Sequence, residues 1–433
     1  MNRSFTSYPV NNFVEVKSKM LNWTKQFNIF CLLDNHQYNP DIYPDHSQFE
    51  CLLAAGSIKT LQPPNAGGAF EALQEFVEEQ KDWIFGHLAY DLKNETEALS
   101  SQNHDGIHFP DLFFFVPQII VILKKESLGI GIIEGDADII YNNIFSEEKD
   151  LSTIKGITPH LISRFSRDEY LDTIKNIKHN ILRGDCYEIN FCQEFYAENF
   201  EIDPLDTYVK LSQLSPNPFG GFYRLHDKFL LCSSPERYLK KVGSKIYSQP
   251  IKGTARRNLL NKEEDESNKK KLSSSKKEIS ENVMVVDLVR NDLSKVCLEG
   301  SISVEELFGV YTFPQVHQMI STITGTIDKQ FSFIEILKAT FPMGSMTGVP
   351  KKKVMQLIEK YERTKRGIFS GGLGYITPGG DFDFNVVIRS IVYNSTNKYV
   401  SMQAGSAITF YSEPENEYEE CLVKIEAMKK VLS

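Results

Sequence analysis

Two segments of the sequence each carry a pair of acidic residues at a spacing that places both carboxylates on one side of a helix. In the segment 278–293, Met284, Val285 and Leu288 form an apolar stripe at helical spacing, and Glu281 falls near its middle with Glu278 one turn earlier. A carboxylate aimed into a core is costly unless it is paired or bound to a cation. Glu281 therefore predicts either a buried salt bridge or a cation site.

The last segment of the chain, ENEYEECLVKIEAMKKVL, repeats this pattern. Glu417 and Glu420 lie three residues apart on one flank of an apolar stripe, and Lys424 follows one turn later. Acidic pairs are common on helix surfaces, so this segment alone favours a solvated face. If the two segments met, their carboxylates could hold one Mg²⁺, which takes oxygen ligands and keeps positions open for water and substrate.

Lys252, in the segment Gln-Pro-Ile-Lys-Gly-Thr, has two interpretations. A lysine is usually solvated, but desolvation or a neighbouring cation lowers its pKa and makes it a nucleophile. Glu236, in Ser-Pro-Glu-Arg, precedes it by one strand–turn–strand and could donate or accept a proton. His317 is equally consistent with a structural hydrogen bond and with catalysis.

Arg389 lies in an apolar segment, 385–393, which predicts a strand buried on both faces. A guanidinium keeps its charge, so it needs an anion, either an internal carboxylate or the carboxylate of a substrate. The Gly-rich turn FPMGSMTGVPKKK offers free N–H groups to an anion. It is not a nucleotide loop, because Gly348 is followed by Val349 and Pro350 rather than by Lys and Ser or Thr.

The composition of the 433 residues, 41% hydrophobic and 24% charged, is that of a globular protein. A formal net charge of −9 argues against nucleic acid as the main partner. Seven scattered cysteines without a CxxC pair fit reduced thiols. The first residues lack an apolar signal core, and the longest apolar run, 113–123, reads as a buried strand too short to span a membrane. We expect a cytoplasmic protein without a membrane partner.

Hydrophobic patterns predict many strands and several helices without strict alternation, which favours the α+β class. A helix is expected from Arg167 to a stop at Gly184, and the charged run 258–281 is expected to be a solvated helix or loop. A change of character near 150–160 suggests two regions, 1–155 and 156–433. The other expected elements are strands over 27–33, 83–90, 113–123, 188–195, 221–232 and 245–251.

Several motifs resemble, in order, those of the chorismate-utilising enzymes. They are GDCYEINFCQ (184–193), SPERYL (234–239), PIKGTARR (250–257), SENVMVVDLVRNDL (280–293), HQMISTITG (317–325), GSMTGVPKKKVMQLI (344–358), GGLGYI (371–376), VIRS (387–390) and QAGSAI (403–408). The resemblance is densest over 165–433 and looser before it. It implies a large α/β sandwich of two interleaved halves, with an N-terminal region over 1–155 and a chorismate-binding catalytic region over 156–433.

The resemblance also implies roles for individual residues. Mg²⁺ would be held by Glu281 and Glu420, with Glu278 and Glu417 as supporting acids. His317 would lie near the reacting ring. The residues expected to contact the substrate are Gly253, Thr254, Thr347, Tyr375, Arg389, Gly405, Ser406 and Lys424.

The sequence PIKGT is typical of the family members that aminate chorismate at C4, whereas anthranilate synthases usually have PIAGT. The implied mechanism is covalent: Lys252 attacks C2 while the 4-hydroxyl leaves with the help of Glu236, and ammonia then adds at C4. The product would be 4-amino-4-deoxychorismate, for 4-aminobenzoate and folate synthesis. An anthranilate synthase component I is the alternative, and an inactive ligand-sensing homologue is a remote one.

Two further features bear on this expectation. Glu188 stands where relatives commonly have Gln, or Lys in those that form salicylate, so isochorismate and salicylate chemistry are not expected. No Gly-x-Cys-x-Gly pattern of a glutaminase occurs in the chain, so ammonia would come from a separate glutamine amidotransferase subunit or from solution. The resemblance leaves open whether the N-terminal half holds a tryptophan pocket.

Overall fold

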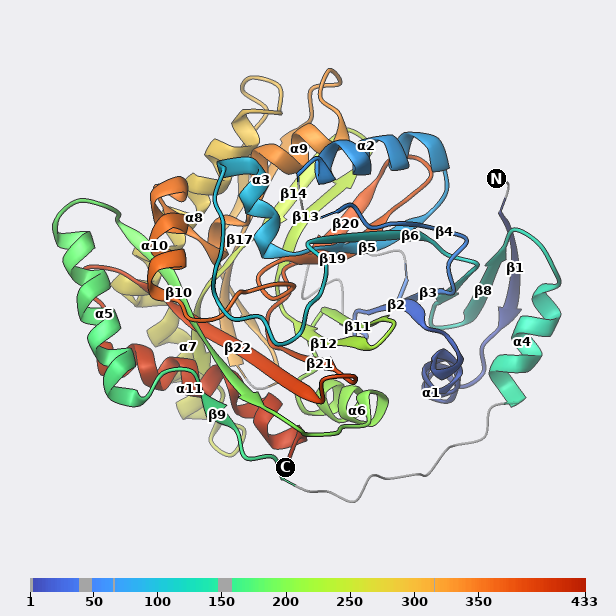
Figure 1. Ribbon diagram of the computed structural model, residues 1–433, viewed down its shortest axis with the longest axis horizontal. Helices are drawn as coiled ribbons and strands as arrows, with labels where there is room; N and C mark the ends of the chain where they lie inside the picture. Colours follow the sequence, from blue (N-terminus) through green and yellow to red (C-terminus); the bar gives the residue numbers. More distant parts are fainter. Residues whose placement is uncertain (1–2, 39–48, 65–66, 147–157, 315) are drawn as a thin grey trace.

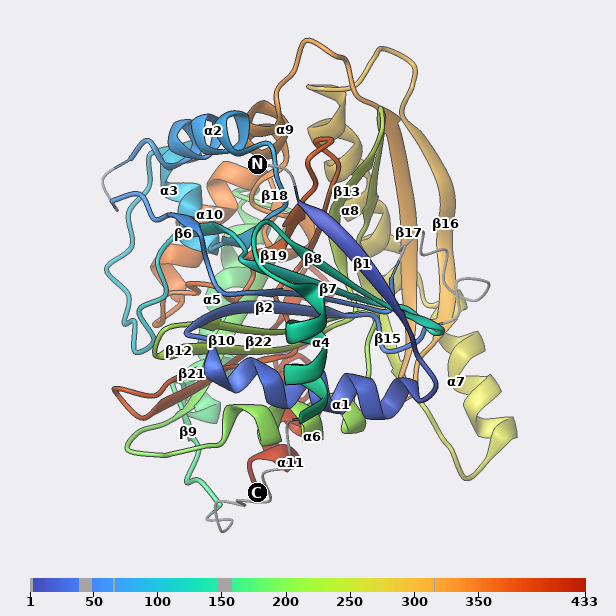
Figure 2. The ribbon, with the colours of Figure 1, turned by 90° about the vertical axis from the view of Figure 1, so that its right-hand side faces the viewer.

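Two large β-sheets pack face to face, and helices cover the outer face of each (Figure 1, Figure 2). Strand β2 (Ile29–Asp34) shows why these layers form. Its Ile29 and Cys31 enter the core between the sheets, whereas Phe30 and Leu32 enter the core beneath the helices, because successive side chains point to opposite faces. The computed structural model describes residues 3–38, 49–64, 67–146, 158–314 and 316–433.

The first sheet has twelve strands, and every ladder in it is antiparallel. A short strand, β9 (Ile162–Ser163), lies off the main path and pairs with β10. In spatial order the path is β1 (Ser4–Pro9), β8 (Ser127–Ile132), β7 (Ile119–Leu123), β3 (Cys51–Ala55), β2, β11 (Phe219–Leu225), β12 (Lys228–Ser234), β21 (Ser390–Asn394), β22 (Tyr399–Ile408), β10 (Glu188–Ala197) and β18 (Gly348–Val349).

The second sheet has ten strands and is also antiparallel. Strand β16 (Ser303–Thr312) lies off its path and pairs with β17. The path is β15 (Ile251–Arg256), β17 (Val316–Thr326), β14 (Lys245–Gln249), β13 (Arg237–Val242), β20 (Phe382–Asn385), β19 (Gly372–Ile376), β5 (Ile84–Leu88), β6 (Leu112–Val116) and β4 (Lys59–Leu61).

The helices fall into groups by the surface they cover. Helices α1, α4, α6 and α11 contribute to the core on the outside of the first sheet, α2, α8 and α9 to that on the outside of the second, and α5 and α10 to a core against β10. Their bounds are α1 (Phe13–Trp23), α2 (Ala69–Gln80), α3 (Lys93–Glu97), α4 (Ala137–Ser146), α5 (Arg167–Leu182), α6 (Pro204–Leu214), α7 (Lys262–Ser274), α8 (Lys276–Ser294), α9 (Phe333–Thr340), α10 (Lys351–Tyr361) and α11 (Pro414–Val431).

This mixture of helices with antiparallel sheets confirms the α+β class and the two-layered sandwich. Each sheet combines strands from both ends of the chain: β2 pairs with β11, and β5 pairs with β19. The boundary expected near 150–160 falls largely on 147–157, outside the described residues. In the described ranges, no helix is both long and apolar enough to cross a membrane.

Three expected strands differ from what the structure contains. The run 113–123 is two strands, β6 and β7, which belong to different sheets and are separated at Pro117 and Gln118. The run 221–232 is a hairpin of β11 and β12 rather than one strand. The segment 385–393 is interrupted: β20 ends at Asn385, β21 begins at Ser390, and Arg389 between them has a φ of +52°.

The expected helix from Arg167 is confirmed as α5. Ser166 caps it by accepting a hydrogen bond from the N–H of Glu169, whose side chain in turn accepts one from the Ser166 N–H. The charged run 258–281 contains α7 and the first turn of α8. These local signals were sufficient because each of the two helices begins at a polar cap, Asn261 for α7 and Ser275 for α8.

A buried arginine ties three segments of the chain together near the start of β10. The Arg366 guanidinium donates to both oxygens of Glu362, at 2.7 and 3.0 Å, and to the carbonyl oxygens of Met346 (2.6 Å) and Asn190 (2.7 Å). Arg366 and Glu362 are both buried, so neither charge has water as an alternative partner. The pair therefore fixes the backbone of β10 against the turn that contains Met346.

Replacing this arginine tests its structural role. Arg366→Leu should lower the free energy of unfolding by about 3–5 kcal/mol, because Glu362 would remain buried without its partner. Urea unfolding followed by circular dichroism measures the change. Arg363→Leu is the matched control, since Arg363 is exposed and pairs with an exposed Glu169, and it should leave the unfolding midpoint nearly unchanged. Equal effects of the two variants would contradict the assignment.

Candidate active site

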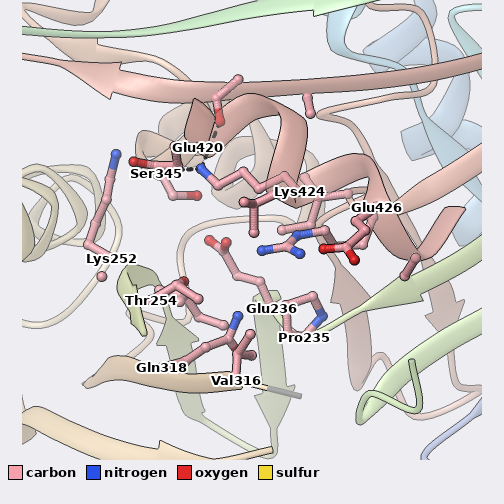
Figure 3. A pocket seen from close by; sticks show the side chains of 18 of the residues that line it. Pro235, Glu236, Lys252, Thr254, Val316, Gln318, Ser345, Glu420, Lys424 and Glu426 are labelled. Carbon is pink, nitrogen blue, oxygen red and sulfur yellow. Dashed lines mark hydrogen bonds and ion pairs between the residues drawn. The ribbon is translucent and has the colours of Figure 1, made fainter. Parts of the chain in front are cut away.

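A cavity of about 570 Å³ lies where the two sheets meet, and it contains most of the residues singled out from the sequence. Strands β15 and β17 of the second sheet, β10 and β22 of the first, and helices α8 and α11 all contribute lining residues (Figure 3). This volume is typical of a site for a small molecule. The predicted residues that line it are Glu236, Lys252, Gly253, Thr254, Glu278, Glu281, Arg389, Gly405, Glu420 and Lys424.

Lys252 is buried at an irregularity in β15. The register of β15 against β17 shifts between Ile251 and Thr254, and Gly253 has a φ of +93°, so the strand bulges where Lys252 enters the cavity. Its Nζ lies 2.6 Å from Oε1 of Glu188, the first residue of β10 in the other sheet. A bulge thus turns an ordinary strand residue toward the opposite sheet.

The electrostatics of this pair favour a charged lysine. Burial alone would lower the pKa of Lys252, but the neighbouring carboxylates, first Glu188 and then Glu281, hold that pKa above its usual value. Glu188 is 1% exposed, and its second oxygen, Oε2, has no hydrogen-bond partner within the described residues. The lysine is therefore an ammonium ion in the resting protein. One oxygen of its closest carboxylate accepts no hydrogen bond from the described residues.

Glu236 has the opposite tendency. Its carboxyl lies in the same cavity, between β12 and β13, and burial raises its pKa to about 7, against the lowering influence of a hydrogen bond from Ser345. Figure 3 shows it projecting into the space between Thr254 and Lys424. A carboxyl with this pKa can give up a proton near neutral pH, as a general acid must.

Three further carboxylates reach the cavity from two helices. Glu278 and Glu281 come from α8 and Glu420 comes from α11. Burial raises the pKa of Glu281 to about 8, and burial together with the charge of Glu420 raises the pKa of Glu278. Oε1 of Glu281 is buried without a hydrogen-bond partner in the described part of the chain. The site thus offers several carboxylate oxygens, and hard divalent cations prefer such ligands.

Lys277 supplies positive charge beside these acids. Its Nζ lies 3.0 Å from Oε1 of Glu417 and 3.8 Å from Oε1 of Glu281, and the pKa of Lys277 is raised because these carboxylates outweigh the effect of burial. Glu417 is buried beneath this contact and does not line the cavity. Across the described ranges, no three His, Cys, Asp or Glu side chains converge as a metal-binding cluster. The donor chemistry fits a cation, while the acids themselves are spread apart.

Two cationic side chains, Arg389 and Lys424, also reach the cavity. Arg389 lines it and its guanidinium forms no ion pair with any described residue, and burial lowers its pKa. Lys424 donates from Nζ to the carbonyl oxygen of Gly405 (2.7 Å) and pairs with Glu420 (2.6 Å). The sequence left two possible anions for Arg389, an internal carboxylate or one from a substrate. No internal carboxylate of the described residues forms an ion pair with it. The geometry leaves Arg389 available for a carboxylate of a ligand.

Five of the expected residues lie outside the cavity. Glu417 is one of them, and His317 is another because its ring is turned away from the cavity. The His317 Nε2 lies 3.1 Å from Asp265 Oδ1, and its Nδ1 lies 3.0 Å from Thr312 Oγ1. The ring therefore holds α7 against β17. The Thr347 hydroxyl donates to the carbonyl oxygens of Met343 and Gly344 instead of facing a ligand. Both side chains serve the local structure.

Tyr375 and Ser406 are the other two. The ring of Tyr375 packs against Trp83 and Phe49, with centroids 5.5 and 5.7 Å apart, beside a separate cavity of only about 50 Å³. That volume is far below the ~300 Å³ of a typical ligand pocket, so the described structure contains no ready pocket for tryptophan there. Ser406 is buried next to Gly405 without lining the active cavity.

Several lining residues were missed in the sequence. Gln318, Ser345 and Phe369 line the cavity, and Oε1 of Gln318 is buried without a partner among the described residues. Figure 3 shows Gln318 beside Thr254. Neighbouring side chains on a strand point to opposite sides, so His317 and Gln318 cannot both face the cavity. This alternation was the only feature of the sequence that could have pointed to Gln318. Phe369 precedes β19 and had no distinguishing pattern.

Comparisons with known proteins agree with this site. A family model described as chorismate binding enzyme matches residues 36–430. The aminodeoxychorismate synthase component 1 of Salmonella typhimurium is 34% identical over 78% of this chain and 74% of its own length. The anthranilate synthase component 1 of Aquifex aeolicus is 30% identical over 81% and 74%. The probable chloroplastic aminodeoxychorismate synthase of Oryza sativa is 34% identical over 80% of this chain, which spans only 43% of that relative.

A solved structure has the same fold. Anthranilate synthase component I from Streptococcus pneumoniae superimposes with a TM-score of 0.77 at 24% identity, over 91% of this chain and 94% of that one. The family model covers most of the chain, including every residue identified in the cavity. The chain therefore belongs to the family of chorismate-binding enzymes.

Proposed function

We propose that this protein aminates chorismate at C4, forming 4-amino-4-deoxychorismate through a covalent bond to Lys252. The observation that carries the proposal is the buried position of Lys252 in the cavity that the acid Glu236 also lines. A nucleophile and a proton donor on one side of a bound ring can divide a difficult substitution into two easier ones. The names of several relatives at 30–34% identity support the same reaction.

The two steps balance as follows. The Lys252 amine forms a bond to C2 of chorismate, the ring double bonds shift, and the C4–O bond breaks as Glu236 gives its proton to the departing hydroxyl, which leaves as water. Ammonia then forms a bond to C4, the double bonds shift back, and the C2–N bond to Lys252 breaks. Glu236 takes up the proton that the new amine releases. The net change is replacement of the hydroxyl by an amine, with the enolpyruvyl group retained.

The charged side chains of the cavity suit this substrate. Chorismate is a dicarboxylate, and Arg389 and Lys424 provide positive charge that can orient one carboxylate. Glu281 and Glu420 would hold Mg²⁺, with Glu278 and Glu417 as supporting acids. When bound, the cation would neutralise a substrate carboxylate and complete the charge balance of the cavity.

Ammonia would be supplied by a separate glutamine amidotransferase subunit. The term "component 1" in the names of the bacterial relatives is consistent with an enzyme of more than one component. The pathway would then be 4-aminobenzoate and folate synthesis.

One specific observation favours a second function. The relative from Aquifex aeolicus is named as an anthranilate synthase component 1, at 30% identity over most of both chains. That reaction would aminate C2 and eliminate pyruvate. Lys252 would then occupy the neighbourhood of the carbon that ammonia must reach, which makes this alternative the weaker one.

The product distinguishes the two functions. The purified protein should convert chorismate, Mg²⁺ and an ammonium salt to a product that retains the enolpyruvyl group and carries an amine at C4. Mass spectrometry with ¹⁵N-ammonium identifies it. Release of pyruvate with formation of fluorescent anthranilate would refute the proposal and support the alternative.

The raised pKa of Glu236 has a consequence for stability. Its pKa is about 7 in the folded protein against an ordinary value of 4.5, so the folded state loses stability relative to the unfolded state as the pH rises from 4.5 to 7. Glu236→Gln does not titrate. It should therefore be increasingly more stable than the wild type over this range, by roughly 3 kcal/mol above pH 7. Urea unfolding of both proteins at several pH values measures this difference, and a difference independent of pH would contradict the assignment.

Removal of one acid tests the cation site. Glu281→Gln should weaken Mg²⁺ binding about tenfold or more, because one anionic oxygen ligand is lost. Isothermal titration, or Mn²⁺ titration followed by electron paramagnetic resonance, reports the affinity without any turnover. Glu426→Gln is the matched control: Glu426 lines the mouth of the cavity and pairs with Lys430 (2.8 Å). Equal affinity in both variants would remove Glu281 from the site.

A further inference from the structure

We propose that Glu188 is the base that removes a proton from Lys252 before the attack on C2, and the acid that returns it when the lysine leaves. This inference rests on the proposed function, since it concerns the lysine that would form the covalent bond. It adds a catalytic residue at a position where the sequence differs from many family members. Glu236, which lines the cavity, is assigned to the oxygen at C4 and does not serve this purpose.

The need for a base follows from the state of Lys252. An ammonium ion has no lone pair and cannot attack carbon, and the surrounding carboxylates hold the pKa of Lys252 above its usual value. A proton must therefore leave Nζ after the substrate binds. Arg256 lines the cavity with an exposed side chain, whereas Lys252 is only 8% exposed. Transfer to a neighbouring side chain is more direct than transfer to bulk water.

Glu188 is placed to accept that proton. Its Oε1 lies 2.6 Å from Nζ of Lys252, and within the described chain it is the one carboxylate at ion-pair distance from this lysine. A general base must lie within about 2.6–3.2 Å of the atom that gives up the proton. The second oxygen of Glu188 is buried without a partner, so the carboxylate can hold a proton on either oxygen.

The backbone around Glu188 fixes its position. Strand β18 pairs with the first two residues of β10, the Tyr187 N–H donates to the Val349 carbonyl (2.8 Å), and the Asn190 N–H donates to the Thr347 carbonyl (2.7 Å). Gly348 permits this approach, because a Cβ there would lie 2.1 Å from the Glu188 carbonyl oxygen. The Gly-rich turn, which the sequence suggested as an anion site, thus holds the backbone of the base in place.

The proton balance is closed within the pair. The Nζ proton of Lys252 moves to Glu188 before the C2–N bond forms, and the adduct carries a protonated Glu188. When ammonia bonds to C4 and the C2–N bond breaks, Glu188 returns the proton to the departing amine. Glu236 carries out the separate exchange at C4, so each carboxyl ends the cycle in the state in which it began.

The test is the rate of adduct formation in Glu188→Gln, which preserves shape but cannot accept the proton. The variant and the wild type are mixed with chorismate and Mg²⁺ without ammonia, quenched at intervals, and examined by intact-protein mass. The variant should form the Lys252 adduct some 10²–10⁴-fold more slowly, the usual loss for a missing base. Its rate should rise with pH, since only lysine already deprotonated can react, while chorismate binding measured by titration calorimetry stays unchanged.

Controls separate this inference from the proposed function. Glu426→Gln removes a carboxylate from the mouth of the same cavity and should form the adduct at the wild-type rate. If the wild type forms no adduct, or if Lys252→Ala forms it equally well, the covalent mechanism itself fails. If the wild type forms the adduct and Glu188→Gln does so equally fast, only the role of Glu188 is overturned. Loss of chorismate binding in Glu188→Gln would instead assign it a structural role.

Discussion

A buried ion pair between the two sheets, Lys252 with Glu188, is the interaction on which the site depends. A charge removed from water is costly unless a partner is held in good geometry. Here each partner belongs to a different sheet, so the pair can form only when β15 and β10 are correctly placed. The bulge at Gly253 and the close approach at Gly348 are the local features that bring the two side chains together. The chemistry and the packing of the sheets therefore share one constraint.

The remaining charges of the cavity are arranged around this pair. Carboxylates from α8 and α11 line the cavity together with the cations Arg389 and Lys424, and Lys424 pairs with Glu420 of its own helix at 2.6 Å. Burial raises the pKa values of Glu236 and Glu281, so negative charge on these two carboxylates is disfavoured in the free protein. A metal ion bound beside Glu281 would stabilise its charged form. This arrangement explains how a protein with net charge −9 can bind an anionic substrate.

The sequence predicted the centre of the site better than its periphery. Glu281 could be found because a carboxylate within an apolar helical stripe is anomalous, and Lys252 because a motif resemblance overcame the usual expectation of a solvated lysine. Strand register was beyond such reasoning. His317 and Gln318 are neighbours on one strand, and only the pairing with β15 decides which of them faces the cavity.

Some elements of the fold could likewise be predicted from the sequence and others could not. Helices with polar caps, such as α5, were predicted closely because their signals are local. The split of 113–123 into strands of two sheets was missed, since both halves are apolar and only Pro117 marks the change. The position of Arg389 between β20 and β21 was missed for the same reason: its apolar neighbours conceal the left-handed residue that directly precedes β21.

Each sheet contains strands from both ends of the chain, and this has a consequence for cutting the protein into two fragments. The N-terminal strands form one contiguous end of each sheet, meeting the rest at the β2–β11 and β5–β19 ladders. A break in the chain near residue 155 would leave two fragments, each with two long unsatisfied strand edges of matching register. Such edges recruit other strands, so the fragments would either recombine with one another or aggregate. The first third of the chain thus acts as an intramolecular cap on both sheets.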